Sequence, residues 1–98
     1  MYKDKFIWDA EKYLSNIGKH GIAFEEASSV FEDEQAIYEY DDAHTESEER
    51  FKVIGFSERA RLLMVCHCYR NGDNLIRIIS ARKATKREHT IYGRQKHE

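Results

Sequence analysis

The sequence predicts an α+β domain with an N-terminal strand, two helices, a four-stranded antiparallel meander and a C-terminal helix. Two observations lead to this fold class. Apolar residues recur at the helical spacing of three or four as far as Phe31, and at the strand spacing of two from Gln35 onward. Turn-forming residues then separate consecutive strands, as antiparallel hairpins require. Helices that are segregated from an antiparallel sheet are typical of the α+β class.

The first strand and the first two helices are predicted from helix-capping residues and from apolar residues at helical spacing. A short apolar run at residues 6–8 predicts a strand, and Asp9 follows it as the N-cap of the first helix. This helix is expected to turn one apolar stripe toward the core, made of Ala10, Tyr13, Leu14 and Ile17. It should end at Lys19-His20-Gly21, because cations suit the negative end of a helix and glycine readily adopts the left-handed conformation. A second, shorter helix is predicted by Phe24, Ala27, Ser28 and Phe31.

Four strands are predicted after Gln35, at residues 36–40, 49–55, 61–69 and 75–81. A polar loop at residues 41–47 and a turn at residues 56–60 connect the first three. The last two are joined by Asn71-Gly72-Asp73-Asn74, which is a strong signal for a tight hairpin.

The last helix is predicted from a capping box. Thr85 and Glu88 have the spacing at which each side chain accepts a hydrogen bond from the backbone of the other residue. This pair predicts a helix from near Thr85 toward Lys96. Ser80 is an alternative cap for an earlier start, and the sequence does not separate the two choices.

Charge is distributed unevenly along a chain whose formal net charge is only −2. Residues 1–50 carry five basic and fourteen acidic side chains, whereas residues 51–98 carry eleven basic and four acidic side chains. Seven lysines and arginines and one acid, Glu88, lie between Arg77 and Lys96. A basic surface of this kind suits a polyanion, and phosphate attraction dominates nucleic-acid affinity. The acidic half is either a solvated surface or a dock for a basic partner.

Strand alternation predicts which side chains share a face, because residues two apart point to the same side. Arg50 and Lys52 share one face of their strand, and Arg77 interrupts the apolar run of the last strand. The remaining candidates on a shared strand face are Arg61, His67 and Tyr69. In an ordinary register, all of these side chains are expected to gather on one open face of the sheet, with the helices on the other.

Such a face contains what is needed to cleave RNA through the 2′-hydroxyl of the substrate. His67 is the candidate acid or base, since an imidazole titrates near neutral pH. Arg77 and Arg82 are candidate phosphate clamps, and Tyr92 is a candidate stacking or donor group. The further candidates for RNA binding are Arg50, Lys52, Arg61, Lys83, Lys86 and Arg87. His67 also has a structural alternative, because a lone histidine inside an apolar strand more often belongs to the packing.

The sequence predicts no metal site and no cofactor. Cys66-His67-Cys68 places two thiols on one strand face and the imidazole on the other, and a tetrahedral zinc ion would need further ligands from elsewhere, for which the sequence has no matching spacing. Glycine-rich phosphate loops and serine-nucleophile motifs are also lacking.

Length and composition predict one domain spanning residues 1–98, since chains divide into several cores only above about 250 residues. The sequence lacks both a run of about 18 apolar residues and the core of a signal peptide, so neither a membrane span nor export is expected. Two closely spaced cysteines suit a reducing compartment, and the predicted location is the cytoplasm.

Five blocks of residues resemble a known protein family. They are Phe6-x-Trp8-Asp9, Lys19-His20-Gly21-Ile22-x-Phe24-Glu25-Glu26-Ala27, Val30-Phe31-x-Asp33, Glu49-Arg50-Phe51-x-x-Ile54-Gly55, and Ile76-Arg77-Ile78-Ile79-Ser80-Ala81-Arg82-Lys83-Ala84-Thr85 with Glu88 and Tyr92. In this order they closely resemble the BrnT-type toxins of bacterial type II toxin–antitoxin systems, over almost the whole chain.

The resemblance implies a RelE-like fold and an endoribonuclease that inhibits translation. It also implies neutralisation by a BrnA-type antitoxin with a ribbon-helix-helix domain, and repression of the operon by the complex, which would contact operator DNA only through the antitoxin. The catalytic residues of RelE relatives vary, so the resemblance carries over only the general roles of Arg77, Arg82 and Tyr92. The alternative reading is a non-catalytic module that binds nucleic acid through the same basic helix.

Overall fold

The structure, a computed structural model, describes residues 5–42, 48–72 and 74–96. Along this part of the chain the elements are β1 (Phe6–Ile7), α1 (Ala10–His20), α2 (Phe24–Ser29), a 3-10 turn η1 (Val30–Glu32), β2 (Ile37–Tyr40), β3 (Phe51–Phe56), β4 (Leu62–Arg70), β5 (Leu75–Lys83) and α3 (Lys86–Lys96). The predicted α+β class and the predicted order of elements are confirmed. Residues 43–47 of the predicted polar loop and Asp73 of the predicted hairpin lie outside the described residues.

The sheet has five strands in the order β1-β5-β4-β3-β2. Strands β2 to β5 form the predicted antiparallel meander. The sheet is nevertheless mixed, because β1 pairs in parallel with β5, with Phe6 opposite Ile76. The backbone N–H of Ile76 donates to the carbonyl oxygen of Lys5 at 2.7 Å. The N-terminal strand therefore covers an edge of β5 that the predicted four-stranded sheet left open.

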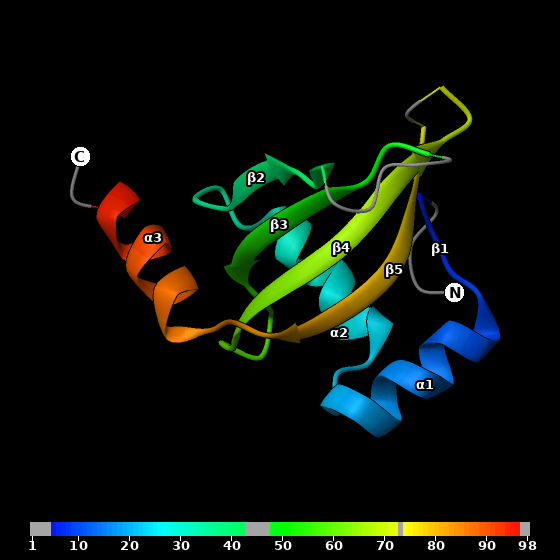
Figure 1. Ribbon diagram of the computed structural model, residues 1–98, viewed down its shortest axis with the longest axis horizontal. Coiled ribbons are helices and arrows are strands. Elements are labelled where there is room, and N and C mark those ends of the chain that lie inside the picture. Colours follow the sequence, from blue (N-terminus) through cyan, green and yellow to red (C-terminus); the bar gives the residue numbers. More distant parts are fainter. Residues whose placement is uncertain (1–4, 43–47, 73, 97–98) are drawn as a thin grey trace.

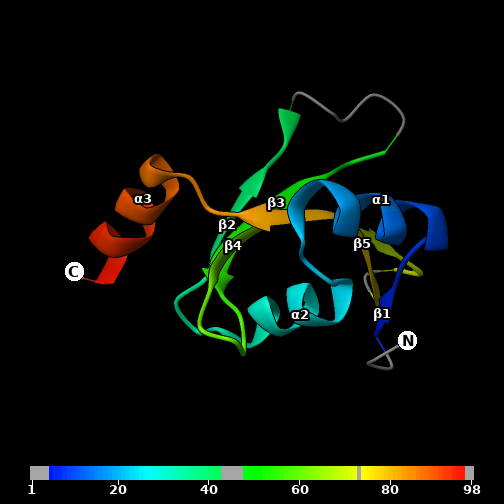
Figure 2. The same cartoon turned by 90° about the horizontal axis from the view of Figure 1, so that it is seen from below.

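The two faces of the sheet differ in what covers them. Val53 of β3 and Leu63 and Val65 of β4 belong to the main hydrophobic core, together with Phe24 and Ala27 of α2. We call this side the helix-covered face; in Figure 1, α2 lies behind the strands, and Figure 2 shows α2 on one side of the sheet. The opposite side is the open face, formed by the alternate residues of the same strands.

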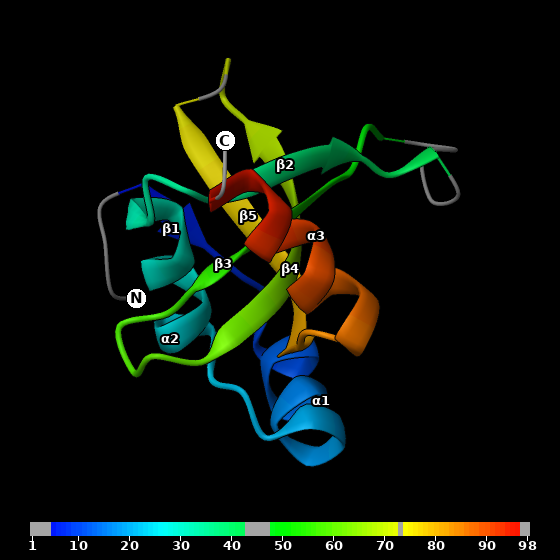
Figure 3. The same ribbon diagram turned by 90° about the vertical axis from the view of Figure 1, so that its left-hand side faces the viewer.

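The helix α3 packs against one end of the open face. Tyr92 of α3 forms a small buried cluster with Ile54, Leu62 and Met64, whose side chains come from β3 and β4. Figure 3 shows α3 close to these strands and separate from α2. The rest of the open face is not covered by a helix of the described residues.

The helix α1 begins and ends as predicted, but its buried face is different. Asp9 accepts a hydrogen bond from the backbone N–H of Lys12 at 3.0 Å, and Gly21 has a φ of +68° at the C-terminal end. Of the predicted apolar stripe, Tyr13 packs against the main core, whereas the side chains of Leu14 and Ile17 are 69% and 40% exposed. The buried residue of this helix is Asn16.

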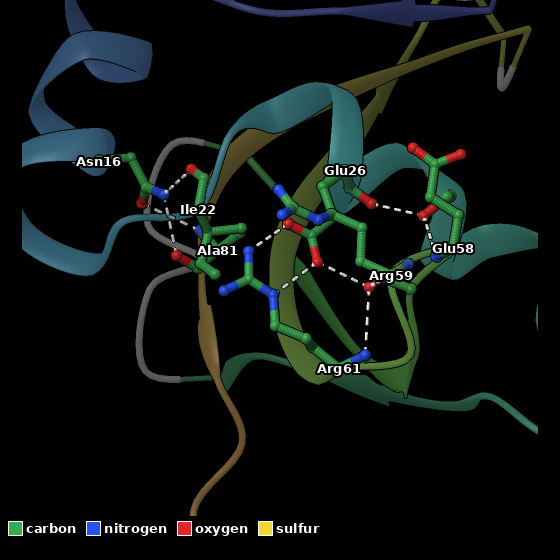
Figure 4. Close-up of polar contacts among 9 residues, drawn as sticks. Asn16, Ile22, Glu26, Glu58, Arg59, Arg61 and Ala81 are labelled. Atoms are coloured by element: carbon green, nitrogen blue, oxygen red, sulfur yellow. Dashed lines mark hydrogen bonds and ion pairs between the residues drawn. The ribbon is translucent and has the colours of Figure 1, made fainter.

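Asn16 replaces apolar packing with hydrogen bonds. Its amide nitrogen donates to the carbonyl oxygens of Ile22 and Ala81, both at 2.9 Å, and its Oδ1 accepts from the N–H of Ala81 at 3.0 Å (Figure 4). The side chain thus holds α1 against β5 through hydrogen bonds to backbone groups.

The tight hairpin between β4 and β5 agrees with the prediction. Asn71 and Gly72 have φ values of +56° and +62°, the left-handed conformations that such turns require. Among the described residues, the structure contains no helix that combines the length and the apolar character needed to cross a bilayer.

Candidate functional site

The open face carries a shallow cavity of about 340 Å³, which we call the central groove. Its lining residues are Asp41, Arg50, Lys52, Met64, Cys66, Ile79, Ser80 and Arg82. They come from β3, β4, β5, the residue that follows β2 and the residue that precedes β3.

The register of the sheet explains how cations come to surround this groove. Lys52 of β3 and Ser80 of β5 lie on either side of Cys66 in β4, and Arg82 is opposite Met64. The central strand β4 thus supplies an uncharged floor, whereas the neighbouring strands supply the charges. Burial raises the pKa of the Cys66 thiol, so this residue stays uncharged at neutral pH.

A second cavity of about 280 Å³, the α3 groove, continues from the central groove toward α3. It is lined by Glu39, Lys52, Ile54, Met64, Thr85, Arg87, Glu88 and Ile91. The two grooves share Lys52 and Met64. An extended ligand in the central groove would therefore continue along α3.

Arg82 is fixed in position by the capping box of α3. The carboxylate oxygens of Glu88 accept hydrogen bonds from the two terminal nitrogens of Arg82 at 2.8 and 2.9 Å. Glu88 Oε1 also accepts from the N–H of Thr85 at 2.9 Å, and Thr85 Oγ1 accepts from the N–H of Glu88 at 3.1 Å. The predicted capping box is confirmed, and the alternative cap, Ser80, lies within β5. The hydrogen bonds from Arg82 lower the pKa of the Glu88 carboxyl, so the pair is ionised at neutral pH.

The structure places Tyr92 in the packing of α3. The residue is 4% exposed, and its hydroxyl donates to Asp33 Oδ2 at 2.7 Å. Burial and this hydrogen bond raise the pKa of Tyr92 to about 12. Its ring also meets the ring of Phe56 edge-on at 5.3 Å. These contacts orient α3 beside the groove and leave little of the ring for stacking on a base.

His67 lies on the helix-covered face and has no exposed surface. The prediction that it shares the open face with the cations is wrong. Its ring centroid lies 4.8 to 6.2 Å from the rings of Phe31, Tyr38, Phe51 and Tyr69. Burial lowers its pKa to about 4, so the imidazole is neutral at pH 7. Because a carbonyl oxygen only accepts, the 3.2 Å contact with Val65 O places the proton on Nδ1, and Nε2 faces the Tyr69 hydroxyl at 3.4 Å.

Arg61 also lies away from the open face, contrary to the prediction. Its guanidinium binds the carboxylate of Glu26 through two nitrogens, one of them Nε at 2.9 Å from Oε2 (Figure 4). Glu26 is buried, and its Oε2 also accepts from the Ser57 hydroxyl at 2.7 Å. The hydrogen bond from Arg61 lowers the pKa of Glu26. This ion pair connects α2 to the β3–β4 turn.

The remaining predicted cations divide between the grooves and other surfaces. Arg50 lines the central groove and forms an ion pair with Glu48 at 3.5 Å, and Arg87 lines the α3 groove. Arg77 occupies the same face of β5 nearer the hairpin, opposite Cys68. Lys83 and Lys86 are exposed and line neither groove.

The polar residues of this site that sequence reasoning missed include Glu88 as the partner of Arg82, and Ser80 and Cys66 as lining groups. The capping-box spacing already singled out Glu88. The other two required the register between strands, which the sequence does not contain.

The site is suited to hold phosphates by charge and hydrogen bonding. Within residues 5–42, 48–72 and 74–96, no group of three or more His, Cys, Asp and Glu side chains is arranged to hold a metal ion. Arginine presents paired donors that match phosphate oxygens, and lysine adds a point charge. Fold and site together define a small α+β domain with a cationic groove for a polyanion on its open sheet face.

Comparisons with known proteins identify the family. The profile described as "Ribonuclease toxin, BrnT, of type II toxin-antitoxin system" matches residues 8–88. The chain belongs to this family, and the predictions of a BrnT-type toxin and of a ribonuclease are confirmed.

A solved structure agrees with this assignment. The crystal structure of the Brucella abortus ribonuclease toxin BrnT is similar to this chain with a TM-score of 0.65 and 26% sequence identity, covering 86% of this chain and 100% of that one. A search of curated proteins gave no match.

Proposed function

We propose that this toxin, acting as a single domain with a RelE-like arrangement of its elements, is a metal-independent endoribonuclease that cleaves RNA in the central groove and thereby inhibits translation. The observation that supports the proposal best is the convergence of Arg50, Lys52 and Arg82 on one groove of an otherwise uncovered sheet face. Cations in such a groove bind the backbone of RNA and stabilise the charge that develops during its cleavage.

The proposed reaction uses the substrate's own 2′-oxygen. This oxygen loses its proton and attacks the adjacent phosphorus, the bond to the 5′-oxygen breaks, and the leaving oxygen takes up a proton, so that a 2′,3′-cyclic phosphate forms. Arg82 and Lys52 stand on opposite sides of β4, where they would hold the phosphorane oxygens between them. Arg77 would bind the next phosphate along the same face. We assign His67 to the core and Tyr92 to the positioning of α3.

The antitoxin partner follows from membership of a type II system. We propose that a BrnA-type antitoxin with a ribbon-helix-helix domain neutralises the toxin by covering the open face, and that the complex contacts operator DNA through the antitoxin alone. An antitoxin segment that orders on binding would compete directly with RNA. The proposed place of action is the cytoplasm, where the two free thiols, Cys66 and Cys68, would stay reduced.

The test is RNA cleavage by the purified protein with and without excess EDTA, followed by analysis of the ends. We expect cleavage to survive EDTA and to leave 2′,3′-cyclic phosphate or 3′-phosphate ends. Lys52→Gln and Arg82→Gln should each lower kcat about 100-fold, the usual effect of removing one group that stabilises transition-state charge. Assays with and without ribosomes would show whether the toxin cuts free or translated RNA.

Several outcomes would contradict the proposal. Cleavage that stops in EDTA and leaves 3′-hydroxyl ends would exclude the 2′-oxygen mechanism. RNA binding without cleavage or growth arrest would instead support a non-catalytic nucleic-acid-binding module.

A further inference from the structure

A third groove lies between α1 and β5, and the proposed reaction uses none of the α1 side chains that line it. This α1 groove has a volume of about 590 Å³ and is lined by Asp9, Glu11, Lys12, Ser15, Lys19, His20, Arg77, Ile79 and Ser80. It shares Ile79 and Ser80 with the central groove. The α3 groove, the central groove and the α1 groove therefore form one continuous path across the open face.

The helix α1 turns a basic stripe toward this groove. Lys12, Ser15 and Lys19 have the spacing i, i+3 and i+7, which places them on one side of a helix. Lys12 and Lys19 are about 10 Å apart along the helix axis, so they would reach different phosphates of one strand. Arg77 faces them from β5.

The two lysines of α1 have fewer acidic partners than the cations of the central groove. Among the described residues, Lys12 and Lys19 form no ion pair within 4.0 Å, whereas Arg82 is bound to Glu88 and Lys52 lies 4.0 Å from Glu39. Of the two acids that line the α1 groove, Asp9 is engaged as the N-cap of α1. The basic residues extend to the opposite, C-terminal end of the helix, at Lys19 and His20.

We infer that the α1 groove is a second RNA subsite, which holds the phosphates of the substrate strand beyond the one that is cleaved. The inference rests on the proposed function, since it takes the central groove to be the place of cleavage. Lys12 and Lys19 bind these phosphates by charge, and Ser15 and Ser80 can donate hydrogen bonds to their oxygens. RNA is favoured over a protein segment because the two residues that the α1 groove shares with the central groove, Ile79 and Ser80, are uncharged, so no acidic side chain stands at that junction. Substrates that reach α1 then bind more tightly than shorter ones, without a change in the chemical step.

The test measures the affinity of the full chain for two RNA oligonucleotides in which every 2′-oxygen is methylated, so that cleavage through that oxygen is blocked. The short one fills only the central groove, and the long one extends beyond it at both ends. The variant is Lys12→Gln with Lys19→Gln. The matched control is Lys5→Gln with Arg59→Gln, which removes the same charge from exposed residues that line none of the three grooves.

We expect the double variant to bind the long RNA about 5-fold more weakly for each lost lysine, since an exposed charge pair contributes at most about 1 kcal/mol. The slope of log affinity against log salt should become shallower by about 1.4 for two lost phosphate contacts on a single strand. The double variant should keep the wild-type affinity for the short RNA and the wild-type kcat on a cleavable RNA. The control variant should keep the wild-type affinity for both RNAs and the wild-type kcat. Long oligonucleotides extended at only one end would show the direction of the strand.

Three results would overturn the inference: unchanged affinity for the long RNA, an equal loss for both lengths, or a loss of antitoxin affinity with RNA affinity unchanged. The last would identify the groove as a protein interface. Failure of the proposed function is a separate result, because binding of the methylated RNA does not depend on cleavage. If the double variant loses affinity as expected but the protein cleaves no RNA, the inference of a second subsite stands and the proposed enzyme mechanism is refuted.

Discussion

The hydroxyl of Tyr92 donates a hydrogen bond to Asp33 Oδ2 at 2.7 Å, across a separation of 59 residues in the chain. The same carboxylate oxygen accepts from the backbone N–H of Phe56 at 2.8 Å. Asp33 thus joins α3 to the end of β3. This contact holds α3 at the end of the open face, next to Arg82 and the α3 groove.

We expect Tyr92→Phe to destabilise the fold without removing catalysis. A hydrogen bond to a charged group contributes about 1.5 to 3 kcal/mol to the free energy of unfolding, and the phenylalanine ring keeps the packing. Urea unfolding should show this loss, whereas kcat per folded molecule should stay within a few-fold of the wild type. Tyr40→Phe, on a residue that is 44% exposed, is the matched control and should change stability by less than about 0.5 kcal/mol. A large fall in kcat with unchanged stability would contradict this assignment and indicate that Tyr92 takes part in the reaction.

Burial of His67 predicts a specific dependence of stability on pH. The pKa of His67 falls from about 6.5 in the unfolded chain to about 4 in the fold, so between these values the unfolded state binds more protons. Stability from the neutral imidazole is complete above pH 6.5 and is lost as the pH falls toward 4. By pH 5 this loss should reach about 2 kcal/mol.

The measurement is urea unfolding of the wild type and of His67→Phe between pH 7 and pH 5. The variant should lack this part of the pH dependence, since it carries no group to protonate, and the exposed His20→Gln should keep it. Equal slopes for wild type and His67→Phe would contradict the burial argument. A folded His67→Phe protein that still cleaves RNA would place His67 outside the catalytic set.

The fold was largely predictable because its signals are local. The glycine that ends α1 and the Asn71-Gly72 turn each specify a backbone conformation through neighbouring residues. The pairing of β1 with β5 joins residues 70 positions apart, and no local pattern encodes it. The predicted buried face of α1 was only partly right for a related reason: the residue that α1 buries is Asn16, which is held by hydrogen bonds to Ile22 and Ala81 rather than by hydrophobicity.

The candidate site was predicted only in part because alternation identifies shared faces but not which face is covered. Arg61, His67 and Tyr69 do share strand parity with one another. They also share it with Leu63 and Val65, which are fully buried, and that apolar pair decides which side the helices cover. Lys52 and Arg82 come together through the register of β3, β4 and β5, which is a property of the assembled sheet.

The capping box of α3 offers a way to separate stability from the positioning of Arg82. Glu88→Gln keeps an oxygen that can accept from the N–H of Thr85, but it removes the charge and half of the paired contact with Arg82. We expect kcat/KM for RNA cleavage to fall about tenfold, since a loosened arginine is less well placed for the transition state.

Thr85→Ala is the matched change on the other half of the box. It removes the oxygen that accepts from the N–H of Glu88 and should cost about 1 kcal/mol of stability, while Arg82 keeps its partner. Kinetic assays beside urea unfolding should therefore show loss of activity in the first variant and loss of stability in the second. Equal values of kcat/KM for both variants would show that Glu88 caps α3 but does not position Arg82 for cleavage.

Neighbouring cations at the start of α3 should differ in their contribution to RNA binding. Lys86 and Arg87 are both exposed, but only Arg87 lines the α3 groove beside Lys52. A contact with phosphate supplies affinity without sequence preference, so Arg87→Gln should weaken binding by a similar factor for every RNA sequence. The slope of log affinity against log salt should become shallower by about 0.7. Lys86→Gln removes the same charge one residue away and should leave the slope nearly unchanged. If both substitutions flatten the slope equally, the affinity for RNA depends on the total charge of this region, including Lys83. The RNA would then not follow a defined path through the α3 groove.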